Sequence, residues 1–177
     1  MQNASTIATD RYLTLSVGSA VFALSIHCVR EILDAPDITA IPQAPPCMPG
    51  IVNVRGEAVA VCDLGCQLGL DPVAHTPDTR IVIVERRHDG RLSLAGLLAD
   101  AVLEVVEIEG ASVQPPPRAS AAMLRGIAGD GGRFLLLLDL DAVFRRGAFG
   151  DRAEASRNTS EADESGPGGD AGRPTAD

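Results

Sequence analysis

The spacing of the four cysteines indicates whether this sequence could form disulfides or bind a metal. Cys62 and Cys66 form a CxxxC pair, whereas Cys28 and Cys47 stand alone. No histidine stands at a spacing that would complete a zinc site with them. We therefore expect neither a disulfide nor a metal framework, but small apolar side chains in a reducing compartment. An enzyme that uses Cys62 or Cys66 as its nucleophile is an alternative that alkylation would test.

The histidines and two aspartates are the other candidates for acid–base work. His75 and His88 fall in expected loops, and His27 falls at a junction where a surface residue is more common than a general base. Asp63 and Asp139 resemble a pair of catalytic carboxylates, but each ends an apolar run just before a short helical turn. This position favours capping, in which a side-chain oxygen accepts from a free backbone N–H.

Motifs for covalent or phosphate chemistry are missing from the sequence. There is no GxSxG elbow, no phosphate-binding loop and no HExxH. Gly129, Gly131 and Gly132 form GxGG without a following Lys, Ser or Thr, which favours a hairpin turn. We therefore expect no enzyme, no catalytic or metal-binding residue and no cofactor.

A block of sequence occurs twice, and one arginine separates the copies. Residues 50–64 recur as 126–140 at a constant separation of 76 positions. Residues shared by both copies are explained by a shared fold. Arg55, whose counterpart is Gly131, needs another reason. The matched pairs are Gly50/Gly126, Ile51/Ile127, Gly56/Gly132, Asp63/Asp139 and Leu64/Leu140.

Earlier segments repeat in the same order, which indicates an internal duplication. Residues 29–33 resemble 102–106, with Glu31 over Glu104, and residues 22–24 resemble 92–94. Two copies are too few for a solenoid, so two packed half-domains are expected.

The elements that would position these residues are short strands punctuated by Gly and Pro. Apolar residues at 26, 29 and 32–33 instead fit about two helical turns, ended before Pro36. Many short strands predict an all-β barrel or sandwich. The expected strands are 12–17, 21–26, 50–54, 57–62, 80–85, 92–97, 101–108 and 133–138, with helical turns at 64–68 and 140–144.

Composition and charge exclude several classes of function. The chain has 177 residues, 45% of them hydrophobic, and a net charge of −9. Every formal positive charge is an arginine, and the acidic balance argues against nucleic acid and against anionic membrane surfaces. The aromatic residues needed to stack single-stranded bases are also scarce, which opposes a single-stranded nucleic-acid binder.

The ends of the chain differ from its middle. Residues 1–10 show no signal peptide, and no apolar run reaches the roughly 18 residues of a membrane span. Residues 147–177 hold seven acids and three arginines among Gly, Ser and Ala. We expect a flexible start at 1–10, one domain over 11–146, a disordered acidic tail over 147–177 and a cytoplasmic location.

The middle of the sequence resembles the CheW family of chemotaxis coupling proteins. The resemblance rests on Val29-x-Glu31-Ile32, on Ile38-Thr-x-Ile41-Pro42 and on the Asn-x-Arg-Gly…Asp-Leu block of residues 53–64. It continues through 81–84, 96–102, 124–126 and 136–140, and covers about residues 11–144. No phosphotransfer, ATPase or receiver segment accompanies it, so a free-standing coupling protein fits better than a kinase.

The resemblance implies two intertwined five-stranded, SH3-like β-barrels with short helical turns and a non-catalytic scaffold role. It implies two partners, the cytoplasmic tip of a chemoreceptor and the regulatory domain of a chemotaxis histidine kinase. It implies no nucleic acid, no direct membrane insertion and a monomer outside the signalling array. A related pathway controlling surface motility or another output is the alternative. The implied partner-binding residues are Val29, Glu31, Ile32, Gly50, Asn53, Arg55, Gly56, Ile81, Val82 and Asp100.

The roles of these residues stay open at this level. The planar fork of Arg55 could hold a carboxylate or backbone carbonyls of a partner, or it could clamp a loop. Val29 and Ile32 share a helical face in the expected helix, and Ile81 and Val82 would divide between the core and a kinase-facing edge. Ala60, Pro49, Gly65 and Arg80 depart from the family pattern, which leaves partner choice undefined.

Overall fold

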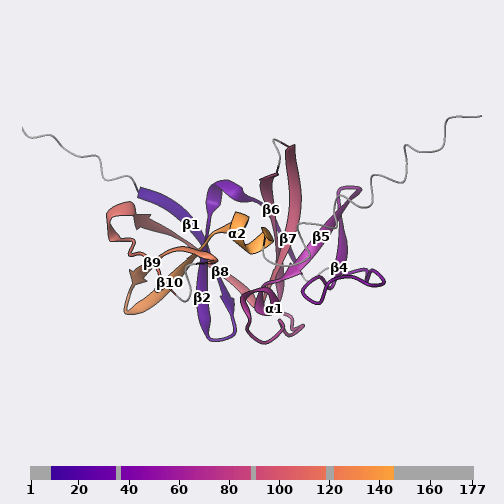
Figure 1. Ribbon diagram of the computed structural model, residues 1–177, viewed down its shortest axis with the longest axis horizontal. Helices are drawn as coiled ribbons and strands as arrows, with labels where there is room; N and C mark the ends of the chain where they lie inside the picture. Colours follow the sequence, from indigo (N-terminus) through magenta and orange to yellow (C-terminus); the bar gives the residue numbers. More distant parts are fainter. Residues whose placement is uncertain (1–8, 35–36, 89–90, 119–121, 146–177) are drawn as a thin grey trace, which may run out of the picture.

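Two five-stranded sheets, each curled into a small barrel, make up the described part of the protein (Figure 1). The computed structural model describes residues 9–34, 37–88, 91–118 and 122–145. The expected tail over 147–177 and most of the expected flexible start lie outside these residues. Within them, no helix is long and apolar enough to cross a membrane.

The strands of the two barrels are exchanged along the chain. The first barrel has the strand order β8-β1-β2-β10-β9, and the second has β3-β6-β7-β5-β4. The strand that follows the hairpin β1–β2, β3, therefore belongs to the second barrel, and the strand that follows the hairpin β6–β7, β8, belongs to the first. The elements are β1 Thr9–Val17, β2 Ala20–Ser25, η1 Ile26–Cys28, β3 Val29–Asp34, β4 Gly50–Val54, β5 Glu57–Asp63, α1 Leu64–Leu68, β6 Arg80–His88, β7 Arg91–Ala99, β8 Ala101–Glu109, η2 Gly110–Ser112, β9 Leu124–Asp130, β10 Arg133–Leu138 and α2 Leu140–Arg145.

The duplication seen in the sequence reappears as strand register. Gly50 pairs with Val61 in the β4–β5 hairpin, and Gly126 pairs with Leu137 in the β9–β10 hairpin. These pairs are related by the same separation of 76 positions. Each barrel also holds one parallel pair, β5 with β7 and β10 with β2. The expected all-β fold of two intertwined barrels is confirmed.

The helix expected over residues 26–33 is wrong. Only the first three of these residues form a 3-10 turn, and β3 follows at once. The strand pairs antiparallel with β6, and its exposure alternates residue by residue. Val29, Glu31 and Leu33 thus lie on one face, so the strand pairing overrides the helical spacing of the apolar residues.

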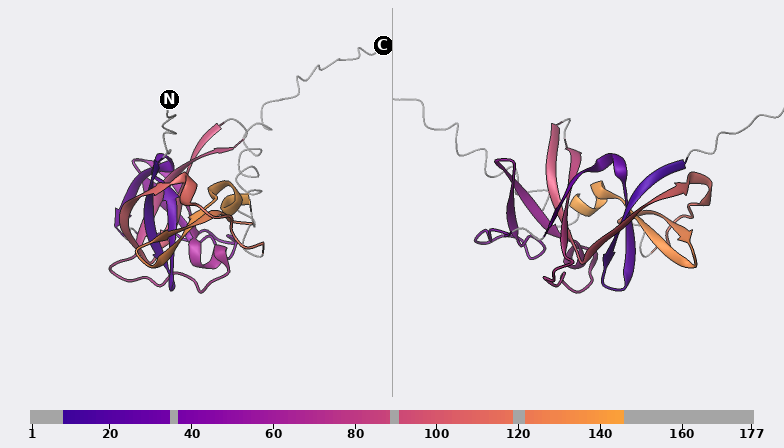
Figure 2. Two further views of the ribbon diagram at one scale, coloured as in Figure 1. Left: turned by 90° about the vertical axis from the view of Figure 1, so that its left-hand side faces the viewer. Right: turned by 180° about the vertical axis from the view of Figure 1, so that it is seen from behind.

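A shared hydrophobic core joins the barrels. Buried residues of β1 and β2 lie in the same cluster as those of β5, β6 and β7, and Val143 and Phe144 of α2 belong to it. A smaller cluster lies within the first barrel, around Leu135 and Leu137. The rear view shows α2 lying between the two barrels (Figure 2).

Candidate docking surface

The tip of the β4–β5 hairpin is a two-residue turn with both residues in the left-handed region. Arg55 has φ of 54° and Gly56 has φ of 91°, the pattern of a type I′ turn. The Asn53 side-chain oxygen accepts a hydrogen bond from the Gly56 N–H at 2.8 Å. Asn53 and Gly56, both expected to bind a partner, therefore shape the turn that presents Arg55.

Arg55 is the exposed member of this turn. Its side chain is 83% exposed, and its Nε lies 3.3 Å from Oε1 of Glu31 on β3. The structure thus brings together two residues that the sequence placed 24 positions apart. A shallow hollow lies beside the pair, lined by Arg30, Glu31, Val54, Arg55, Glu57 and Leu94.

The matching turn of the first barrel shows what the fold alone requires. Gly131 and Gly132 have φ of 54° and 91°, the same as Arg55 and Gly56. A left-handed conformation costs a non-glycine residue on the order of 1–2 kcal/mol, which glycine avoids. Arg55 therefore occupies a position where glycine would fit better. Strain of this kind often marks a functional site.

The other expected residues of β3 and β4 have separate roles. Ile32 is 42% exposed, but as the residue after Glu31 in a strand it lies on the opposite face of β3 from the ion pair. Val29 is half-buried and packs against the shared core. A Cβ added to Gly50 would overlap the carbonyl oxygen of Thr39, so this glycine permits the close approach of two backbones. Gly50 lies at the opposite end of β4 from the turn.

Two expected contact residues are buried and a third lies elsewhere. Ile81 and Val82 are both 0% exposed, and β6 pairs with β3 on one side and β7 on the other. The expectation that they reach a kinase-facing edge is therefore wrong, because both faces of this strand are covered by core. The Asp100 carboxylate accepts from Gly18 N–H at 2.6 Å, across the base of the β1–β2 turn.

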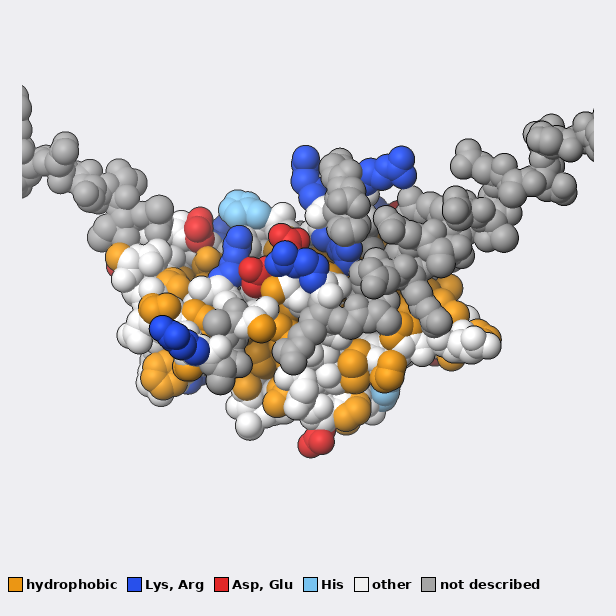
Figure 3. All heavy atoms as spheres, viewed as in Figure 1, with side chains coloured by type: hydrophobic (Ala, Val, Ile, Leu, Met, Phe, Trp, Pro, Cys, Tyr) orange, Lys and Arg blue, Asp and Glu red, His pale blue; other side chains and the backbone are white. Residues whose placement is uncertain are grey.

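A second hollow lies between the barrels and was not foreseen from the sequence. Arg86 lies over the Phe144 ring, 4.9 Å from its centroid, and burial lowers the pKa of this guanidinium, opposed by the charge of Asp141. Figure 3 shows positive and negative side chains close together along the upper middle of the molecule. The lining residues are Ser25, His27, Cys28, Glu85, Arg86, Arg87, Leu92, Arg125, Leu138, Asp139, Leu140 and Asp141.

The aspartates and His27 have the structural positions expected of them. Asp63 Oδ1 accepts from Cys66 N–H at 3.0 Å, and its carboxylate also accepts from Val73 N–H. Asp139 Oδ1 accepts from Ala142 N–H at 3.0 Å. Both aspartates therefore cap the helix that follows, and His27 is exposed.

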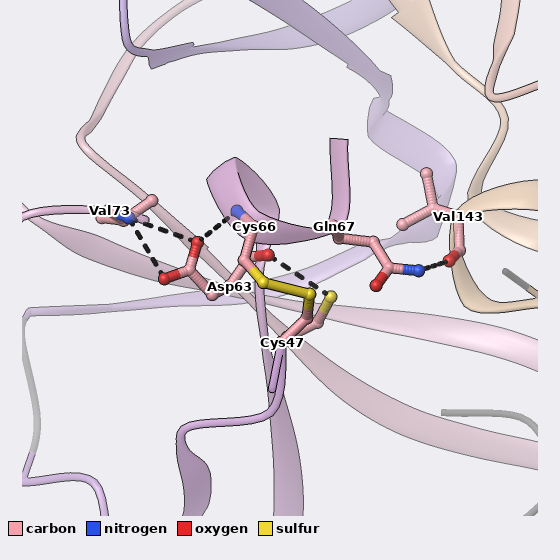
Figure 4. The surroundings of a disulfide bond; sticks show 7 residues. Cys47, Asp63, Cys66, Gln67, Val73 and Val143 are labelled. Atoms are coloured by element: carbon pink, nitrogen blue, oxygen red, sulfur yellow. Dashed lines mark hydrogen bonds between the residues drawn. A yellow bond between two sulfur atoms is a disulfide. The ribbon is translucent and has the colours of Figure 1, made fainter. Parts of the chain in front are cut away.

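The expectation of four separate cysteines is wrong. Cys47 and Cys66 form a disulfide with their Cα atoms 5.3 Å apart, a spacing that such bonds require (Figure 4). The β4–β5 hairpin brings them together. If the antiparallel pairing of Gly50 with Val61 is extended by three residues, Cys47 lies opposite Leu64, two residues before Cys66. Cys62 is fully buried, and this burial raises the pKa of its thiol to about 12, which opposes a nucleophilic role.

Metal ligation finds no support in the geometry. Across the described ranges, no group of three or more His, Cys, Asp or Glu side chains is arranged to hold an ion. Every buried side-chain polar atom of that part of the chain has a hydrogen-bond partner. The exposed chemistry is thus concentrated in arginine–carboxylate pairs and apolar side chains, which suit protein contacts.

Comparisons with known proteins identify the family of this chain. Residues 11–148 match the family described as CheW-like domain. A probable chemotaxis protein CheW of Rhizobium etli is 32% identical over 140 residues, 76% of this chain and 88% of the relative. The protein FrzA of Myxococcus xanthus is 29% identical over 121 residues, 68% of this chain and 72% of that protein.

A solved structure extends the comparison to the fold. The crystal structure of the scaffolding protein TtCheW from Thermoanaerobacter tengcongensis superimposes with a TM-score of 0.71 and 31% identity, covering 79% of this chain and 95% of that one. The fold and these matches define a class of double-barrel scaffold proteins, which are not enzymes. The chain belongs to the CheW-like family, whose members are scaffolds that link chemoreceptors and kinase in chemotaxis.

Proposed function

We propose that this chain is a cytoplasmic, non-catalytic adaptor that binds the cytoplasmic tip of a chemoreceptor with one surface and the regulatory domain of a chemotaxis histidine kinase with another. The observation that carries the proposal is the strained and exposed position of Arg55 at the hairpin tip. A guanidinium there can donate two parallel hydrogen bonds to a carboxylate of a partner, or a single one to a carbonyl. The Arg55 side of its pair with Glu31 is exposed, whereas the Glu31 side chain is only 26% exposed, so a partner reaches the pair from the arginine side.

The receptor surface in this proposal consists of Glu31, Ile32 and Arg55. In this proposal Glu31 and Arg55 orient the partner by their charges, and Ile32 adds exposed apolar area on the opposite face of β3. Asn53, Gly56 and Gly50 shape the β4–β5 hairpin, and Val29 supports β3 from the core side. Asp100 lies between β7 and β8, where its carboxylate accepts from Gly18 of the β1–β2 turn, and this proposal assigns it to the surface for the second partner. The adaptor is a monomer outside the signalling array.

The test measures binding of the full chain to a receptor fragment that contains the tip and, separately, to the kinase regulatory domain. Arg55→Gly should weaken receptor binding about tenfold or more, because charge-assisted hydrogen bonds are worth roughly 1.5–3 kcal/mol. Arg133→Gln is the matched control, since Arg133 makes the corresponding pair with Glu104 in the first barrel. Unchanged receptor binding by Arg55→Gly contradicts the proposal.

A second candidate is an adaptor of a related chemosensory pathway with another output, such as surface motility. The similarity to the protein FrzA favours keeping it. Deleting the chromosomal gene and scoring swimming and surface spreading separately distinguishes the two. Loss of swimming alone supports the first candidate, and loss of spreading alone supports the second.

A further inference from the structure

The disulfide lies at the base of the hairpin that carries Arg55. Cys47 precedes β4 and Cys66 lies in α1 directly after β5, so the bond closes a loop that contains the whole hairpin. Asp63 N–H donates to the Cys47 carbonyl at 2.9 Å beside it. Figure 4 shows the bond joining the incoming loop to α1. The hairpin is therefore fixed at its base, opposite the turn.

The surroundings connect this bond to two other parts of the fold. Thr39 and Ile51 exchange backbone hydrogen bonds of 2.9 Å, which tie the loop before Cys47 to the edge of β4. The Gln67 side-chain amide, next to Cys66 in α1, donates to the Val143 carbonyl of α2. Loop, hairpin and the contact between the two short helices thus meet at the cysteine pair.

We propose that Cys47 and Cys66 form a reversible thiol–disulfide site, exchanged by a low-molecular-weight disulfide or a protein dithiol, and that the bond locks the hairpin base. In oxidation, the thiolate of one cysteine attacks a sulfur of the disulfide oxidant and releases one thiol. The second cysteine then attacks the mixed disulfide and releases the other thiol. The cysteine pair loses two electrons and two protons, which reduce the oxidant to two thiols.

Access distinguishes this pair from Cys62, whereas Cys28 is a partly exposed free thiol. Cys47 and Cys66 are both partly exposed, so a small reagent can reach the bond. Cys62 is fully buried and its thiol stays protonated. Cys28 lies in η1, and its Sγ–H donates to the Ser25 carbonyl at 2.8 Å. Burial also raises the pKa of the Cys28 thiol, which slows its reaction, so we expect exchange mainly at the Cys47–Cys66 pair.

The bond has a consequence for the docking surface, which rests on the proposed function. Residues 41–49, directly before β4, include four prolines and an Ile41 that is 39% exposed. With the bond closed, this loop and the hairpin form one rigid unit that presents Arg55. A pre-organised surface binds more tightly, because less chain entropy is lost in the complex.

The experiment equilibrates the full chain in mixtures of reduced and oxidised glutathione and then counts free thiols after denaturation. We expect two free thiols in the oxidised form, Cys28 and Cys62, and four in the reduced form. Reduction should lower Tm by roughly 10 °C and speed hydrogen exchange over residues 47–66, given the length of the closed loop. Cys28→Ser should keep this transition and Cys47→Ser should lose it.

Two results overturn the proposal. One is a count of four thiols in oxidised glutathione, and the other is a bond that forms without changing Tm or exchange in the hairpin. If Cys47→Ser folds poorly, the thiol–disulfide equilibrium of the unmodified chain still tests the proposal. The receptor fragment should bind the oxidised form several-fold more tightly. If the receptor fragment binds both forms equally, the disulfide has no consequence for docking. If it binds neither form, the proposed function is rejected, and the thiol counts alone then test the proposal that Cys47 and Cys66 form a reversible site.

Discussion

Arg55 and Arg133 pair with equivalent glutamates from different places in two matching hairpins. Arg55 is the first turn residue of β4–β5 and lies 3.3 Å from Glu31, whereas Arg133 follows the turn of β9–β10 and lies 2.6 Å from Glu104. In each barrel the pair joins the hairpin at one edge of the sheet to the strand at the other edge, β3 or β8. Both barrels therefore have an ion pair across their closing edges.

This relationship separates what the barrel needs from what Arg55 adds. In the first barrel, the ion pair across the sheet edges uses Arg133, which lies in β10 without a left-handed backbone, while the turn itself is Gly131-Gly132. The second barrel uses an arginine at the tip, in the left-handed region, where the side chain is more exposed than that of Arg133. Edge closure alone does not require an arginine at the tip.

The first prediction concerns the stability of the Arg55→Gly variant. Relief of the left-handed strain offsets the greater freedom of glycine in the unfolded chain and the loss of an ion pair, exposed on its Arg55 side, that is worth about 0–1 kcal/mol. The free energy of unfolding in urea should stay within about 1 kcal/mol of the parent. A loss of more than about 2 kcal/mol means that Arg55 acts as a structural clamp and that its strain has another explanation.

The second prediction compares the two helix caps. Asp63→Ala removes the acceptor for Cys66 N–H and for the buried Val73 N–H, while Asp139→Ala removes the acceptor for Ala142 N–H. A lost cap costs about 1 kcal/mol, and a buried N–H left without a partner costs about 1–3 kcal/mol more. Urea denaturation should therefore show the larger loss for Asp63→Ala. Equal losses contradict the role assigned to the Val73 contact.

The hairpins and caps could be predicted from the sequence because their signals are local. Glycine in the turn, alternating apolar residues and an aspartate before the helical turn each act within a few residues, and the duplication showed them twice. The register of β4–β5 and β9–β10 agrees with the separation found in the sequence. Arg55 was recognised as unusual for the same reason, since its copy is a glycine.

The misses depend on contacts between distant segments. β3 resembled a helix because Glu31 interrupts its apolar alternation, and only the pair with Arg55 explains a carboxylate on that face. Ile81 and Val82 looked half-exposed because nothing local shows that both faces of β6 are covered. The cysteine pair follows from hairpin register, a signal that was present in the sequence but was not used.

The third prediction tests the close approach at Gly50. A Cβ there would overlap the Thr39 carbonyl, whereas a Cβ at Gly129 of β9 meets no atom within 4 Å. Gly50→Ala should lower stability by about 1–3 kcal/mol, as overpacking does. Gly129→Ala is the matched control in an open strand position, and it should be neutral or stabilising by up to about 1 kcal/mol. Thermal unfolding of both variants measures the difference, and similar Tm values would show that the Thr39 segment moves aside freely.

The fourth prediction is a loss of stability at alkaline pH that depends on Cys62. Burial raises the pKa of this thiol from its ordinary value of 9.0 to about 12, so the unfolded chain loses its proton first as pH rises. The contribution is fully present below pH 9 and declines between pH 9 and 12, by at most about 1.4 kcal/mol per pH unit. Urea denaturation at pH 8 and pH 10.5 measures the decline, and Cys62→Ala is the control that lacks it. If the parent and Cys62→Ala lose stability in parallel over this range, the folded-state thiol is not held protonated by its burial, and Cys62 returns as a candidate nucleophile.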